Sequence, residues 1–158
     1  MSDAPLAAGL RIHHVGLTVS DIERSVEFYG TTLGMHLVRR RVAEADYLSQ
    51  QTGFEGVRLA AASFKPSAES PQTIELVQYL THAGPALNPA TNQVASAHLC
   101  FETPDIQQTF SRLQAQGVRF KTPIVPITSG PNQGGSVVYF YDPDGFILEL
   151  FQPPKGAT

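Results

Sequence analysis

The stretch His14-Val-Gly-Leu-Thr-Val-Ser-Asp21-Ile22 decides the fold, because it returns later in the chain as His98-Leu-Cys-Phe-Glu-Thr-Pro-Asp105-Ile106. A second stretch also repeats: Ile74-Glu-Leu-Val-Gln78 returns as Leu148-Glu-Leu-Phe-Gln152. In each copy a histidine precedes a glutamate, so the repeat predicts a duplicated unit with two imidazoles and two carboxylates in all. Nitrogen and oxygen donors of these kinds suit a divalent metal.

The first copy begins with a strand and a helix. Residues 10–19 alternate and are rich in β-branched side chains, which favours a strand. Asp21 follows as a candidate N-cap, and apolar residues recur at helical spacing up to Leu33, where Gly34 ends the pattern. Three further strands are expected at 35–45, 57–64 and 73–80. The order βαβββ therefore defines a first module over residues 10–80.

The second copy repeats this order after a connector at 81–93 that is rich in Gly, Pro and Asn. A strand is expected at 94–103 and a helix from Asp105 to Gly117, followed by strands at 118–121, 136–141 and 146–152. The turn Asp142-Pro-Asp-Gly145 joins the last two. We expect an α+β fold of two tandem βαβββ modules, 10–80 and 94–152, within one domain over 10–152. Their curled mixed sheet would surround a metal cavity, with the helices outside.

Strand alternation predicts which way the repeated residues face. Val15, Leu17 and Val19 form the apolar row that should meet the helix, so His14 and Thr18 face the other side. The same alternation places His98, Glu75 and Glu149 opposite the aliphatic rows of their strands. Carboxylates in an apolar concavity are costly without a cation or a proton, which is the physical reason to expect a metal there.

Composition narrows the classes of function. The chain of 158 residues is 42% hydrophobic and has a net charge of −3, without a Lys/Arg block beyond Arg39-Arg40-Arg41, which we interpret as a solvated strand. Binding to nucleic acid or to a membrane surface is therefore not expected. A single cysteine, Cys100, excludes an intrachain disulfide and is interpreted as a packing residue. We see no signal peptide or spanning segment, and expect a cytoplasmic protein.

The motifs resemble those of the vicinal oxygen chelate superfamily, which includes glyoxalase I, methylmalonyl-CoA epimerase, extradiol dioxygenases, and the fosfomycin and bleomycin resistance proteins. The resemblance covers residues 12–152. It rests on His-x-x-Leu-x-Val-x-Asp at 14–21, Phe28-Tyr29 with Leu33-Gly34-Met35, Ile-Glu-Leu at 74–76, Ala-His-Leu at 97–99, and Asp-Pro-Asp-Gly-Phe-Ile-Leu-Glu-Leu at 142–150. These motifs are specific to the superfamily and much less specific to one activity.

The resemblance implies that one divalent ion (Ni, Co, Mn, Fe or Zn) is held by His14, Glu75, His98 and Glu149. The full set looks like that of bacterial-type glyoxalase I. It implies a lyase or isomerase in which a carboxylate removes a proton α to a carbonyl and the metal stabilises an enediolate. Glu149 is the favoured base, with Glu75 as ligand and possible partner acid. The alternatives are an Fe(II) ring-cleaving dioxygenase and a non-catalytic drug-binding resistance protein.

The substrate and the assembly are less specified. Glyoxalase I has Arg and Asn at the positions of Thr18 and Tyr79, which weakens the expectation of glutathione. We expect a small-molecule substrate, a carbonyl compound or thioester, in a pocket that includes Thr18, Tyr47, Arg58, Tyr79 and Tyr139. The family implies a homodimer, with the metal site within one chain or across the interface. His13 matches no ligand position and is expected on the helix side. The glycine-rich loop 122–134 is a candidate lid.

Overall fold

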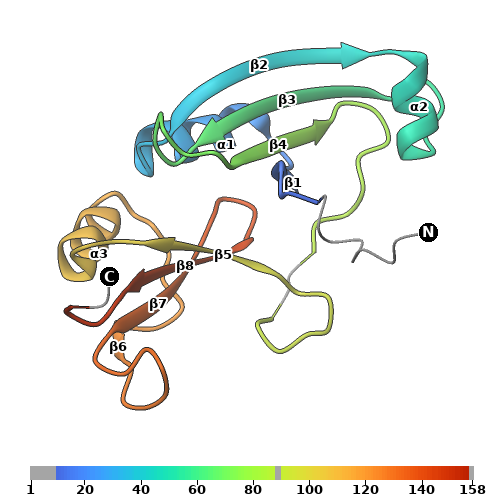
Figure 1. Cartoon of the computed structure of the whole chain (residues 1–158). Helices are drawn as coiled ribbons and strands as arrows, with labels where there is room; N and C mark the ends of the chain where they lie inside the picture. The colour runs from blue at the N-terminus through green and yellow to red at the C-terminus, as the bar shows by residue number, and fades with distance from the viewer. Residues whose placement is uncertain (1–9, 88–89, 157–158) are drawn as a thin grey trace, which may run out of the picture. The chain divides into compact units, whose positions relative to one another are not determined.

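The computed structural model describes residues 10–87 and 90–156 (Figure 1). The chain divides into two compact units, Met1–Gly84 and Pro85–Thr158. Of the connector expected at 81–93, residues 88 and 89 lie outside the described part of the chain. Each unit has its own four-stranded mixed sheet and its own helix packed on that sheet. The α+β fold class predicted from the sequence is confirmed.

The first unit contains the strands β1 (His14–Thr18), β2 (His36–Glu44), β3 (Arg58–Lys65) and β4 (Thr73–Tyr79), in the spatial order β1-β4-β3-β2. β1 is parallel to β4, and the other neighbours are antiparallel. The α-helix α1 (Ile22–Glu27) continues into a wider π-helical segment, η2 (Phe28–Thr32). A short helix, α2 (Asp46–Thr52), lies between β2 and β3 (Figure 1).

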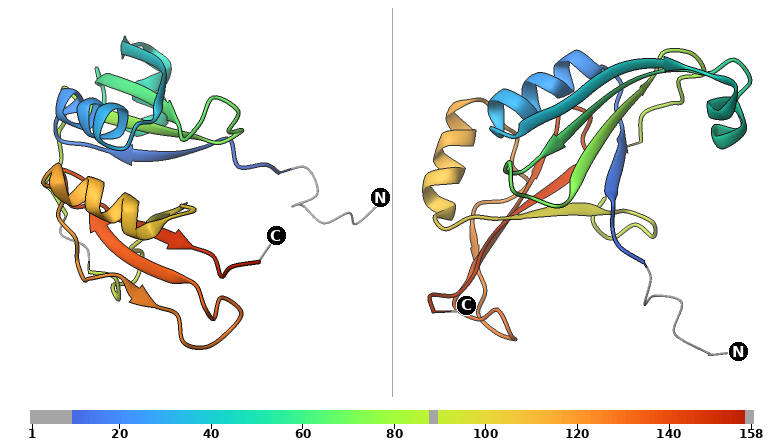
Figure 2. Two further views of the ribbon diagram at one scale, coloured as in Figure 1. Left: turned by 90° about the vertical axis from the view of Figure 1, so that its left-hand side faces the viewer. Right: turned by 45° about the horizontal axis from the view of Figure 1, so that its top comes forward.

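The second unit repeats this topology with β5 (His98–Glu102), β6 (Val125–Pro126), β7 (Ser136–Tyr141) and β8 (Ile147–Gln152) in the order β5-β8-β7-β6. β5 and β8 are parallel, as β1 and β4 are in the first unit. Its helix is α3 (Ile106–Ala115), which contacts β8. Figure 2 shows α1 and α3, each beside the sheet of its own unit. The duplication seen in the sequence is thus a duplication of topology.

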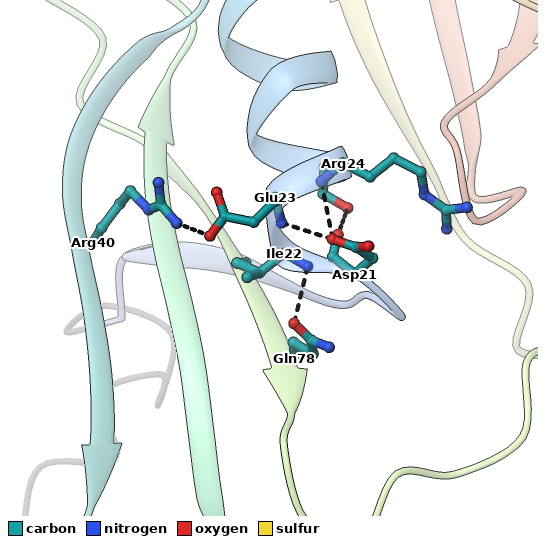
Figure 3. Close-up of polar contacts among 7 residues, drawn as sticks. Asp21, Ile22, Glu23, Arg24, Arg40 and Gln78 are labelled. Carbon is teal, nitrogen blue, oxygen red and sulfur yellow. Dashed lines mark hydrogen bonds and ion pairs between the residues drawn. The ribbon is translucent and has the colours of Figure 1, made fainter.

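The two helices begin in the same way. Asp21 caps α1 by accepting hydrogen bonds from the backbone N–H groups of Glu23 and Arg24 (2.9 and 3.1 Å), and Asp105 caps α3 by accepting one from Gln108 (2.9 Å). These carboxylates satisfy donors that a helix leaves unpaired at its first turn. Figure 3 shows the cap at Asp21.

The repeated glutamines fasten each helix to its sheet. Oε1 of Gln78, on β4, accepts from the N–H of Ile22 at 3.0 Å (Figure 3), and Oε1 of Gln152, on β8, accepts from the N–H of Ile106 at 2.8 Å. Glu75 and Glu149 each lie three residues earlier on the same strands. Because side chains alternate, the glutamine faces the helix and the glutamate faces the other side of the sheet.

The buried rows follow the same division. Leu17, Ile74 and Leu76 are 7%, 5% and 0% exposed on the helix side of the first sheet, and Leu148 and Leu150 are 0% and 4% exposed in the second. His14, Gly16 and Thr18, on the opposite face of β1, are all exposed. The expected alternation is therefore confirmed for these strands.

The structure differs from the expected elements at several points. Residues 118–121 form no strand, and Phe120 makes only an isolated bridge to Phe140, while the edge strand β6 lies inside the segment expected to be a loop. Helix α2 was not predicted, and it ends at Gly53, whose φ of 78° favours glycine. β1 and β5 begin at His14 and His98, four residues later than expected in each case.

No helix within 10–87 and 90–156 is long and apolar enough to cross a membrane.

Candidate metal centre

In the first unit, His14 and Glu75 lie on the parallel neighbours β1 and β4. Glu75 is in register with Gly16, so the histidine lies two residues before the position directly opposite the glutamate. His14 Nε2 is 3.7 Å from Glu75 Oε2, with the side chains 45% and 21% exposed. The other carboxylate oxygen of Glu75 is 4.0 Å from a guanidinium nitrogen of Arg41. A nitrogen donor and an oxygen donor thus converge on the exposed face of this sheet.

This pair lies in the wall of a hollow of about 360 Å³. Its wall contains His13, His14, Arg39 and Glu75, together with Val38, Ser63 and Thr73. His13 was expected on the helix side, and this was wrong: its Nδ1 is 2.9 Å from Nδ1 of His14, and the two rings meet edge to face at 5.2 Å. β1 begins only at His14, so strand alternation does not extend to His13.

In the second unit, His98 and Glu149 occupy the equivalent places on β5 and β8. His98 Nε2 lies 2.9 Å from Glu149 Oε2, and the Glu149 side chain is only 13% exposed. The ring of Tyr139 meets the ring of His98 edge to face, with 5.5 Å between the centroids. Glu149 is in register with Cys100 on one side and Tyr139 on the other. The glutamate is therefore flanked by a thiol and a phenol.

Burial and the carboxylate of Glu149 raise the pKa values of both Cys100 and Tyr139. Desolvation by burial, the negative charge of Glu149 and a hydrogen bond to it, and the charge of Glu102 raise the pKa of the Cys100 thiol to about 11. Desolvation, then the charge of Glu149, raise the pKa of Tyr139 as well, with smaller contributions from Cys100 and from a hydrogen bond to Glu149. Both groups keep their protons at neutral pH and are available to donate to Glu149.

The two pairs differ in their surroundings. Glu75 is in register with Gly16 and Ser63, where Glu149 has Cys100 and Tyr139. Glu75 has a guanidinium near it instead. The duplicated units therefore hold the same donors in different environments, which can give the two carboxylates different roles.

The donors fit a metal ion. Ligand atoms at bond lengths of roughly 2.1 Å that bind at right angles lie about 3.0 Å apart. The 2.9 Å between His98 Nε2 and Glu149 Oε2 matches this spacing, and the 3.7 Å of the His14 pair needs only a small side-chain adjustment. Within residues 10–87 and 90–156, no three or more His, Cys, Asp or Glu side chains form a ligand cluster. Within each unit, one imidazole and one carboxylate lie together.

The residues expected to line a substrate pocket are spread over both units. Tyr139 lies beside His98, and Thr18 lies on the exposed face of β1. Tyr47 is 54% exposed on α2. Tyr79 packs against the small cluster Leu48, Val57 and Leu59, and Arg58 forms an ion pair with Glu44 at 3.3 Å. Among these five residues, Tyr139 contacts a candidate metal-ligating residue, His98.

Sequence reasoning missed Arg39 and Arg41, which it treated as part of a solvated strand. Arg40 forms an ion pair with Glu23 of α1, on the helix side of the sheet (Figure 3). Its two neighbours must then face the side of Glu75, as the Arg41 contact and the position of Arg39 in the hollow show. Alternation along β2 was the available signal.

Paired βαβββ units with a His–Glu pair in each define a class of protein, and the comparisons identify the family. Residues 11–150 match the model of the Glyoxalase/Bleomycin resistance protein/Dioxygenase superfamily, so the chain belongs to that superfamily. This confirms the resemblance seen in the sequence.

Among its relatives, a 2-epi-5-epi-valiolone epimerase of Actinomyces sp. is 30% identical over 99% of this chain and 87% of its own length. A lactoylglutathione lyase of Arabidopsis thaliana is 29% identical over 94% of the chain, which spans only 45% of that relative. A glyoxalase family protein of Bacillus cereus has a similar structure, with a TM-score of 0.81, 21% identity, and coverage of 98% of this chain and 99% of the other. That structure supports the fold alone.

Proposed function

We propose that this protein is a divalent-metal-dependent lyase or isomerase of the glyoxalase and epimerase type, acting on a small carbonyl compound or thioester. In this proposal His14, Glu75, His98 and Glu149 together hold one ion. The observation that carries it is the equivalence of the two pairs, since each has a histidine on the first strand and a glutamate on the last strand of its unit. Relatives named as a lactoylglutathione lyase and an epimerase agree with this class.

When bound, the ion would supply Lewis-acid stabilisation of the negative charge that develops on substrate oxygens, as in an enediolate. The chain itself would supply the base. We assign that role to Glu149, because it is the less exposed of the two glutamates, lies 2.9 Å from His98 and is flanked in register by Cys100 and Tyr139. A base held in a fixed orientation can reach an α-proton without searching for it. Glu75 would serve as ligand and as the partner acid.

The substrate pocket in this proposal departs from a glutathione site at two positions. Thr18 offers no cation where glyoxalase I has an arginine, and Tyr79 is packed in an apolar cluster. Tyr139 is the pocket residue closest to the base and would contact the reacting end of the substrate. We further propose that the protein acts as a homodimer, as the family implies, and that it works in the cytoplasm.

Proton exchange tests the reaction. Metal-reconstituted protein is incubated in D₂O with α-keto acids, α-hydroxyketones and acyl-CoA thioesters, and loss of the α-proton signal is followed by NMR. The wild type should catalyse exchange on at least one class. Glu149→Gln should lower its rate roughly 10² to 10⁴-fold, the range for removal of a general base.

A matched control is Glu102→Gln. It removes an exposed carboxylate from the face of β5 that carries His98, and it leaves Glu149 intact. It should exchange at the wild-type rate. Exchange that persists unchanged in Glu149→Gln would refute the assignment of the base. Consumption of O₂ with Fe(II) and ring cleavage of a catechol, in place of exchange, would identify a dioxygenase and refute the proposed class.

A further inference from the structure

We propose that Arg39 and Arg41 form an oxyanion-binding subsite beside Glu75, so that the substrate carries a carboxylate or phosphate group. This inference rests on the proposed function, because it concerns the substrate of the same site. Arg39 and Glu75 belong to one cross-strand row of the first sheet. Gly16 is in register with Glu75, Glu75 with Ser63, and Ser63 with Arg39. Arg39 therefore ends the row that contains the candidate ligand.

Arg41 belongs to the next row on the same face, since it is in register with Ala61, which is in register with Val77. Its guanidinium reaches back to within 4.0 Å of Glu75. Arg39 borders the hollow with His14 and Glu75, and its side chain has no hydrogen bond or ion pair within the described part of the chain. One positive charge thus borders the hollow, and a second lies beside the glutamate in its wall.

The charge balance calls for an anion. Among the described residues that border the hollow, Glu75 is the only carboxylate. If it binds a metal ion, it no longer neutralises Arg41, and both guanidiniums lack a counter-charge. Guanidinium groups bind carboxylates and phosphates through two parallel hydrogen bonds, which also fix the orientation of the ligand. A substrate with its chelating oxygens at the metal and an anionic group toward β2 would satisfy both arginines.

Arg40 gives an internal control for this inference. It lies between the two arginines in sequence, but it extends the buried helix-side row and forms an ion pair with Glu23 (Figure 3). A general effect of positive charge on β2 would depend on all three arginines. A subsite on the face of Glu75 would depend on Arg39 and Arg41 alone.

The experiment compares neutral and anionic chelators. Metal-loaded Co(II) protein is titrated with 3,4-dihydroxybenzamide, 3,4-dihydroxybenzoate and 3,4-dihydroxyphenylphosphonate, and the Co(II) absorption bands report binding. The benzamide and the benzoate have nearly the same shape and differ in charge. We expect at least one anionic probe to bind about tenfold more tightly than the benzamide. The gain is modest because solvent weakens a charge-assisted hydrogen bond between partly exposed groups. The phosphonate arm tells a carboxylate site from a phosphate site.

The variants Arg39→Met and Arg41→Met should lose most of this preference, Arg39→Lys should retain part of it, and Arg40→Met should keep it in full. Equal affinity for all three probes in the wild type would overturn the subsite while leaving the metal centre intact. So would a preference that survives in the Arg39 and Arg41 variants, or one that falls equally in Arg40→Met.

A second arm separates the subsite from the proposed function. NMR spectra of metal-free protein are recorded with benzoate, benzamide and inorganic phosphate. Shifts of the Ser63 and Glu75 amides with an anion but not with benzamide, absent in Arg39→Met, support the subsite even if the protein takes up no metal. In that case the proposed function fails alone. Absence of such shifts together with absence of catechol binding would overturn both.

Discussion

Replacement of Gln152 by alanine should weaken the attachment of α3 to its sheet. Oε1 of Gln152 accepts from the N–H of Ile106 at 2.8 Å in a partly buried setting. Loss of one neutral hydrogen bond costs roughly 0.5 to 1.5 kcal/mol, and an N–H left without a partner adds to that, so we expect about 1 to 2 kcal/mol. Gln78 makes two such bonds, to the N–H of Ile22 and to the carbonyl of Ser20, so Gln78→Ala should cost about twice as much.

Equilibrium urea unfolding, followed by far-UV circular dichroism and by tyrosine fluorescence, measures both changes. The conservative variant Gln152→Glu keeps the acceptor and adds a negative charge at the beginning of α3, where the helix dipole favours it, so it should lie within about 0.5 kcal/mol of the wild type. A Gln152→Glu variant as destabilised as Gln152→Ala, or a Gln152→Ala variant that unfolds at the same urea concentration as the wild type, would contradict a role of this hydrogen bond in holding α3.

Three further perturbations follow from the structure. Phe140 is fully buried, so Phe140→Ala should lower the free energy of unfolding by roughly 3 to 5 kcal/mol in a urea titration, whereas a change below about 1 kcal/mol would argue against this core. A Cβ at Gly135 would lie 2.6 Å from the carbonyl oxygen of Gln152, so Gly135→Ala should cost roughly 1 to 3 kcal/mol in the same assay, and a neutral result would contradict that approach. The pKa of Cys100 is raised from 9.0 to about 11, so its thiol stays largely protonated at pH values at which an ordinary cysteine has ionised. Because the thiolate is the nucleophile, iodoacetamide should alkylate Cys100 at pH 8 about tenfold more slowly than an ordinary cysteine. Glu149→Gln should move the pH at which alkylation accelerates downward in metal-free protein, and an unchanged profile would refute the role of that carboxylate.

Much of the fold could be predicted because the same sequence pattern occurs in both units. The repeated His, Asp, Glu and Gln positions recur with the same roles in both units, and alternation correctly assigned the faces of β1 and β4. Helix α2 was missed because its seven residues carry too few apolar positions to show a period, although Leu48 is buried. β6 was missed because it has only two residues, Val125 and Pro126, and is a strand only by its pairing with β7.

The site was only partly predictable for similar reasons. The pairing of His14 with Glu75 and of His98 with Glu149 follows from the repeat, and the distances bring each pair together. The neighbours of each glutamate depend on register, which the sequence does not state. Cys100 was interpreted as a packing residue, yet register places it beside Glu149. Arg41 reaches Glu75 through a long side chain whose direction sequence spacing alone does not fix.

The metal content of the full chain tests the proposed metal centre most directly. Protein reconstituted with Ni(II) or Co(II) and freed of excess ion by gel filtration is measured by elemental analysis, together with single alanine variants of His14, Glu75, His98 and Glu149. The exposed His36 on β2 serves as the control position. We expect one ion per chain in the wild type and in His36→Ala, and loss of the ion from each of the four variants. A wild type that binds no ion, or full occupancy after loss of the donors of either unit, would contradict the proposed metal centre.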